Sequence, residues 1–108
     1  MQLTLNHFLI LGAITFCIGL FGALSKRNAV SILMSIEIML NAVNITMIAY
    51  ASAFIHHPPT GTRLTGQIFA IFIITAAAAE AAVALAMIIA IYRRRNTIDV
   101  GEINLMRW

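Results

Sequence analysis

Two glutamates lie deep inside apolar stretches of the sequence, where little can solvate a carboxylate. Glu37 is the one acidic or basic residue between Ala29 and Ile55, and Glu80 is enclosed by alanines in the run Thr75–Ala82. Full burial disfavours the charged form of a carboxyl group, so such a group can bind and release a proton near neutral pH. Glu37 and Glu80 are therefore candidate proton carriers, with a purely structural role as the alternative.

Two asparagines accompany Glu37. At about 100° per residue, Asn41 and Asn44 fall within roughly 40° of Glu37 on a helix. The three residues thus form one polar stripe on an otherwise apolar helix, and this stripe must face protein or water. Ionisable groups at membrane depth are functional more often than not, which favours a role in proton transfer.

The stretches that carry these residues have the length of membrane-spanning helices, which need roughly 20 mostly apolar residues. The chain has 108 residues, of which 61% are hydrophobic and 10% charged. We expect an all-α integral membrane protein with a single domain over residues 1–108. Its three transmembrane helices are predicted at about 3–24, 29–55 and 66–92, and a polar tail at 93–108.

The depths of the two acids follow from helix geometry. At about 1.5 Å per residue, Glu37 lies on the order of 15 Å from the basic pair Lys26 and Arg27, and Glu80 lies about 18–20 Å from either end of its segment. These values predict a difference in depth of about 6 Å across helix axes ~8–10 Å apart. A water molecule or polar side chain must then lie between the acids. Since three helices cannot enclose both acids, we expect partner subunits.

Small residues recur in the first helix at three- and four-residue spacings, at Gly12, Thr15, Gly19 and Gly22. Such a line of small residues lets a second helix backbone approach closely. The alternative is the ordinary glycine content of membrane helices.

Basic residues lie at the ends of the apolar segments. Lys26 and Arg27 follow the first segment and Arg93–Arg95 follow the third, whereas Arg63 is the one Lys or Arg on the opposite side. The positive-inside rule predicts that the N-terminus is outside and the C-terminus is cytoplasmic. The same rule explains the net charge of +3, and without a basic patch interleaved with aromatic residues we expect no nucleic-acid partner.

The sequence contains no motif for a cofactor or a metal. Cys17 is the one cysteine, and zinc-ligand spacing, a haem attachment motif, a phosphate loop and a nucleophile elbow are all missing from the sequence. His56 and His57 could bind a metal or relay protons, but adjacent histidines beside two prolines are more often simply solvated. We expect no cofactor or metal on this chain.

The chain resembles the smallest membrane subunit of respiratory complex I, the K subunit of bacterial NADH:quinone oxidoreductase and its mitochondrial four-L counterpart. The resemblance covers about residues 16–92. It rests on five motifs taken together: Gly19-Leu-Phe-Gly22, Lys26-Arg27-Asn28, Glu37-Ile-Met-Leu-Asn41-Ala-Val-Asn44, Gly66-Gln-Ile-Phe69 and Ala78-Ala-Glu80-Ala-Ala82-Val.

The resemblance implies that Glu37 and Glu80 are the two intramembrane glutamates of that family, in a chain of charged residues that couples quinone reduction to proton translocation. It implies that Lys26 and Arg27 match a basic loop that affects activity. It also implies that the chain is a non-redox subunit, and that NADH, FMN, iron–sulfur clusters and quinone bind to partner subunits. The expected location is the bacterial inner (plasma) membrane, or the mitochondrial inner or thylakoid membrane if the protein is organellar.

Three other readings remain open from the sequence. A homologous small subunit of a multisubunit cation/proton antiporter or of a membrane-bound hydrogenase would have a similar three-helix chain. A rotor-ring subunit of an ATP synthase would have two helices and one membrane carboxylate, and the three predicted helices and two acids of this sequence disfavour that reading. A passive assembly subunit would use both acids for structure only.

Overall fold

The structure is a computed structural model that describes residues 3–53 and 62–103, without the side chains of residues 62–64. These residues form three helices, α1 (Leu5–Ser25), α2 (Ala29–Ala53) and α3 (Thr62–Arg95). Each helix contains a stretch long and apolar enough to cross a membrane, which confirms the predicted all-α membrane architecture. The predicted histidine loop, with His56 and His57, lies outside the described residues.

The third helix is longer than predicted at both ends. It begins at Thr62 rather than at residue 66, because no proline or glycine interrupts the four residues before Gly66. It continues through Arg93–Arg95, where positive charge is favourable at the negative end of the helix dipole. The polar tail therefore begins at Asn96, and α3, at about 1.5 Å per residue, exceeds a hydrocarbon layer ~30 Å thick.

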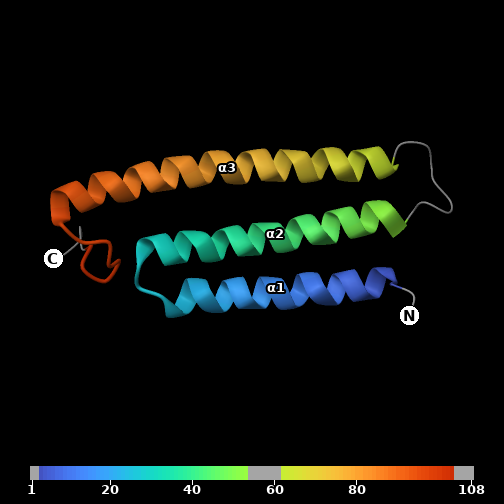
Figure 1. Ribbon diagram of the computed structural model, residues 1–108, viewed down its shortest axis with the longest axis horizontal. Helices are drawn as coiled ribbons and strands as arrows, with labels where there is room; N and C mark the ends of the chain where they lie inside the picture. Colours follow the sequence, from blue (N-terminus) through green and yellow to red (C-terminus); the bar gives the residue numbers. More distant parts are fainter. Residues whose placement is uncertain (1–2, 54–61, 104–108) are drawn as a thin grey trace.

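Helix α2 lies between α1 and α3, and consecutive helices run antiparallel (Figure 1). Within the described part of the chain, α2 contacts both neighbours, whereas α1 and α3 do not contact each other. The first loop and the end of α3 share one end of the molecule. The subunit is therefore a single row of three helices, and most of its apolar surface faces outward.

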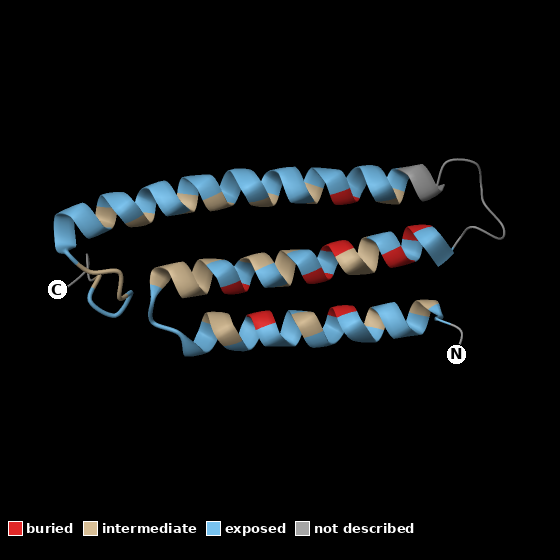
Figure 2. Cartoon of the chain, viewed as in Figure 1, coloured by how far each residue is buried: buried red, intermediate tan, exposed pale blue. Residues whose placement is uncertain are grey.

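Burial is confined to the two sides of α2 and to the surfaces that face them (Figure 2). On one side, a Cβ built at Gly12 would lie 2.7 Å from Thr46 Oγ1, and one at Gly19 would lie 2.6 Å from Met39 Cγ. On the other side, Gly66 of α3 meets Ala51 of α2. These contacts confirm that glycines allow the close approach of α1 predicted from their spacing.

Replacing Gly19 with leucine tests this packing. A Cβ at this position would also lie 2.8 Å from the Ser35 carbonyl oxygen, which cannot move without distorting α2. We expect Gly19→Leu to destabilise the folded protein by about 1–3 kcal/mol or more, as overpacking generally does. The measurement is the thermal unfolding midpoint in detergent. Cys17→Leu adds a similar side chain at an exposed position of the same helix and should leave the midpoint nearly unchanged; equal losses in both variants would contradict the explanation.

Candidate functional site

Glu37 lies on the side of α2 that faces α3. It precedes Asn44 by seven residues and Ala51 by fourteen, which is about two and four helical turns, so the three residues share one helix face. Ala51 contacts Gly66 of α3, which fixes that face as the one packed against α3. We call this packed boundary the α2–α3 seam. Glu37 is half-buried at the seam.

Asn44 is buried in the seam, with 7% of its surface exposed. Its side-chain oxygen Oδ1 has no hydrogen-bond partner among the described residues. A buried acceptor without a partner costs about 1–3 kcal/mol, so this oxygen is a position where a water molecule would be bound favourably. The seam therefore contains a hydrogen-bond acceptor without a partner in the described chain, two helical turns from Glu37.

Asn41 is placed differently from Asn44. Three residues correspond to about 60° around the helix, and the Asn41 side chain is exposed. The predicted polar stripe is thus divided, because Asn44 is in the seam, Glu37 is at its edge and Asn41 faces outward. The sequence did not show which part of the stripe α3 would cover.

Glu80 lies on α3 but outside the seam. The α3 residues that are less exposed recur at three- and four-residue spacings and mark the surface toward α2; they include Gly66, Ala70, Ile73, Ala77, Ala81 and Ala84. Glu80 is about 60° from the middle of that surface and its side chain is exposed. A carboxylate that this chain leaves uncovered needs a neighbouring subunit or water to solvate it inside a membrane.

The helix register places the two acids at nearly the same depth. Glu80 follows Gly66 by fourteen residues and Glu37 precedes Ala51 by fourteen, and the helices are antiparallel. Both acids are therefore on the order of 21 Å from the Gly66–Ala51 contact. The segment lengths alone predicted a difference of about 6 Å, whereas equal fourteen-residue offsets along antiparallel helices leave the two acids at nearly equal depths.

Neither carboxylate has a hydrogen bond or an ion pair within residues 3–53 and 62–103. The same residues contain no group of three or more histidines, cysteines or acids that could hold a metal ion. Within this part of the chain, the two acids thus have no counter-charge at membrane depth.

The predicted basic loop connects α1 to α2, and the side chains of Lys26 and Arg27 are exposed. Asn28 ends the loop by capping α2, since its Oδ1 accepts hydrogen bonds from the Val30 N–H at 2.9 Å and the Ser31 N–H at 3.4 Å. An asparagine directly before an apolar helix is a known helix-start signal, and it could have identified this cap from the sequence.

The C-terminal segment also contacts this loop, which sequence reasoning did not anticipate. The Arg27 carbonyl oxygen accepts a hydrogen bond from the Val100 N–H at 2.9 Å, and the Ala29 N–H donates to the Ile98 carbonyl oxygen at 2.9 Å. The sequence offered one partial signal, Asp99-Val-Gly101, which is typical of a turn. Nothing in it indicated where that turn would lie.

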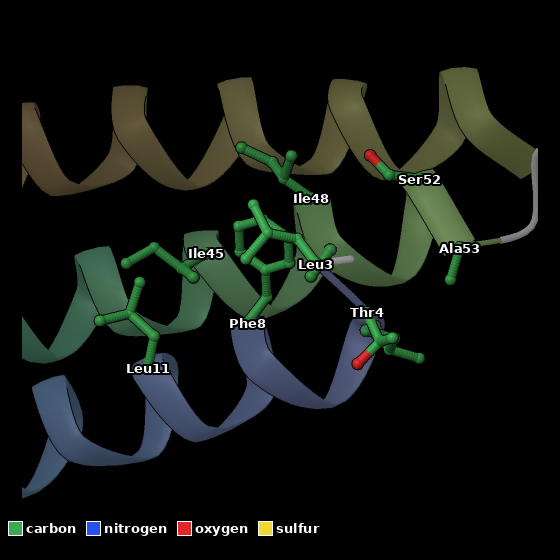
Figure 3. A pocket seen from close by; sticks show the side chains of 10 residues that line it. Leu3, Thr4, Phe8, Leu11, Ile45, Ile48, Ser52 and Ala53 are labelled. Atoms are coloured by element: carbon green, nitrogen blue, oxygen red, sulfur yellow. The ribbon is translucent and has the colours of Figure 1, made fainter. Parts of the chain in front are cut away.

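A groove near the N-terminus is separate from the two acids. It lies between the start of α1 and the end of α2, and Figure 3 shows Phe8, Leu11, Ile45 and Ile48 around it, with Thr4 and Ser52 at one end. Its lining is mostly apolar and contains neither glutamate. The groove can accept lipid or an apolar helix, and its lining contains no ionisable side chain.

Comparison with known proteins identifies the family. The family profile described as NADH-ubiquinone/plastoquinone oxidoreductase chain 4L matches residues 7–108. The chain is 51% identical over 108 residues to NAD(P)H-quinone oxidoreductase subunit 4L of Synechocystis sp., covering 100% of both chains. It is 52% identical over 104 residues to NADH-quinone oxidoreductase subunit K of Desulfitobacterium hafniense, covering 96% of this chain and 94% of the relative. The chain therefore belongs to the NADH-ubiquinone/plastoquinone oxidoreductase chain 4L family.

Proposed function

We propose that this chain is a membrane subunit of a proton-pumping NADH:quinone oxidoreductase, in which Glu37 and Glu80 relay protons while quinone is reduced on partner subunits. One observation carries the proposal. Two carboxylates lie at nearly the same membrane depth on adjacent helices, and neither has a partner in the described chain. Carboxyl groups kept from water switch protonation when a nearby charge moves, which is the property a relay needs.

The position of each acid supports a lateral path. Glu37 is half-buried at the seam and Glu80 is exposed on the flank of α3 beside it, so a proton that moves between them passes from α2 to α3 rather than along a helix axis. Axes of packed helices are about 8–10 Å apart, so one hop is too long for direct transfer. A water molecule bound between the two acids would shorten it.

The proposal places the redox chemistry and the cofactors on other subunits. NADH, FMN, iron–sulfur clusters and quinone would bind there, and this chain would contribute no redox group. Its partners would be the other membrane-arm subunits and the lipid bilayer, in a bacterial plasma membrane or in the inner mitochondrial or thylakoid membrane. Five basic residues at the end shared by the first loop and α3 support a cytoplasmic C-terminus and an outside N-terminus.

The alternatives have less support. The relatives described above are named as quinone oxidoreductase subunits, which favours a quinone-linked assembly over an antiporter or a hydrogenase. Three membrane-length helices in the described chain disfavour a two-helix rotor subunit. A passive assembly role stays in competition, and substitution of the acids separates it from a relay.

Replacing each acid with glutamine tests the relay. Glutamine keeps much of the size and hydrogen bonding of glutamate but carries no titratable proton. We expect Glu37→Gln to lower NADH-driven proton pumping and coupled quinone reduction about tenfold or more, which corresponds to roughly 1.4 kcal/mol of added barrier. Glu80→Gln should cause a similar or smaller loss. Pumping is measured in membrane vesicles by a pH-sensitive dye.

The matched control is Glu102→Gln, which removes the same group outside the membrane-spanning segments and should leave pumping unchanged. Oxidation of NADH by an artificial acceptor that takes electrons before quinone checks that each variant is assembled. Full pumping in an assembled complex with both Glu37→Gln and Glu80→Gln would remove the two acids from the mechanism.

A second test concerns the basic loop. Because Lys26 and Arg27 are exposed at the membrane edge, we propose that their charges act on a partner subunit there. Lys26→Gln with Arg27→Gln should reduce coupled activity several-fold, since an interfacial charge contributes on the order of 1 kcal/mol. Arg94→Gln with Arg95→Gln removes the same charge from the end of α3 and should have a smaller effect. Unchanged activity, assembly and topology in the first pair would contradict a role for the loop charges.

A further inference from the structure

A short antiparallel pairing joins the C-terminal segment to the loop between α1 and α2. The Val100 N–H donates to the Arg27 carbonyl oxygen and the Ala29 N–H donates to the Ile98 carbonyl oxygen, both at 2.9 Å. Asn28 and Asp99 are therefore directly opposite each other. We call this pairing of residues 27–29 with residues 98–100 the clasp.

The C-terminal segment builds its own side of the clasp. Asn96 adopts a left-handed conformation with φ 54° and ends α3, and its N–H donates to the Tyr92 carbonyl oxygen at 2.7 Å. The Asp99 carboxylate then accepts a hydrogen bond from the Gly101 N–H at 2.8 Å, and the Asp99 N–H donates to Thr97 Oγ1 at 3.1 Å. Local side-chain bonds thus hold the turn that presents Ile98 and Val100 to the loop.

Hydrogen bonds hold the backbone of the loop, whereas its two charged side chains are exposed. The Lys26 N–H donates to the Gly22 carbonyl oxygen at 3.3 Å and closes α1, Asn28 caps α2, and the clasp holds the carbonyl of Arg27. The side chains of Lys26 and Arg27 remain exposed. The clasp therefore sets where the backbone carries these two charges without neutralising them.

We propose that the segment Asn96–Gly101 is a positioning element that holds the Lys26–Arg27 loop in place for its partner subunit. This inference rests on the role proposed above for the loop charges. It gives a function to a tail that lies outside the membrane-spanning segments. The proposed role of the two glutamates does not use this tail. Val100 and Ile98 are positioning residues, because their backbone groups bond to the backbone of the loop and act on no proton.

Removal of the clasp hydrogen bonds tests the proposal in the assembled enzyme. Val100→Pro deletes one donor, and Val100→Ala is the matched control because it keeps the N–H. Ala29→Pro deletes the other donor at the first position of α2, where proline is tolerated. We expect each proline variant to reduce NADH-driven pumping by about the same factor as Lys26→Gln with Arg27→Gln, while Val100→Ala keeps the parent rate.

Combination of the variants separates positioning from general stability. Val100→Pro should lower pumping no further in a complex that already carries Lys26→Gln and Arg27→Gln. In that complex the loop has no charges, so its displacement should not change pumping. Multiplied losses would overturn positioning and leave the clasp a structural feature only. If Lys26→Gln with Arg27→Gln did not change pumping, the proposed role of the loop charges would be wrong. If that pair lowered pumping but Val100→Pro did not, only the proposed positioning by the tail would be wrong.

A reversible cross-link supplies the rescue. Opposite residues of such an antiparallel pair have Cα atoms about 4.5 Å apart, within the range for a disulfide. Asn28→Cys with Asp99→Cys, in a Val100→Pro, Cys17→Ala chain, should form a disulfide in the assembled enzyme on oxidation. Pumping should rise on oxidation and fall again with reductant, whereas the Cys17→Ala parent treated in the same way should not change. No disulfide, or a disulfide without recovery, would overturn the proposal.

Discussion

Close contact between helix backbones through small residues is the constraint on which the rest of the structure depends. Gly12 and Gly19 bring α1 against one side of α2, and the Gly66–Ala51 contact brings α3 against the other. In a membrane, apolar side chains gain little by leaving lipid, so such close packing contributes much of the association. The same contacts set the register of α2 and α3, and therefore the relative depth of Glu37 and Glu80.

A row of three helices has a functional consequence. Little of the chain is buried inside the subunit, and Glu80 lies on its outer surface. In lipid this carboxyl group would be very costly, so inside a membrane it needs a neighbouring subunit or water to solvate it. The proposed relay is therefore a property of the assembly, to which this chain contributes two proton-binding groups.

The two ends of the molecule differ in their tasks. At one end, the start of α1 and the end of α2 form an apolar groove without chemistry. At the other end, the N-terminus of α2, the basic loop and the tail that follows α3 are joined by backbone hydrogen bonds. The clasp links the helix that carries Glu80 to the helix that carries Glu37, outside the packed seam.

The sequence by itself determined the class of the protein, the three membrane-length helices, the family and the positions of the acids, because apolar run length and isolated charges are local properties. It also predicted the close packing at Gly19. Only the tertiary structure decided that Asn44 is covered while Asn41 is exposed, that the acids share a depth, and that the tail reaches Arg27. These features depend on which helix face meets a neighbour and on bonds between backbone groups. Since every non-proline residue carries the same backbone N–H and C=O, no pattern of side chains specifies such bonds.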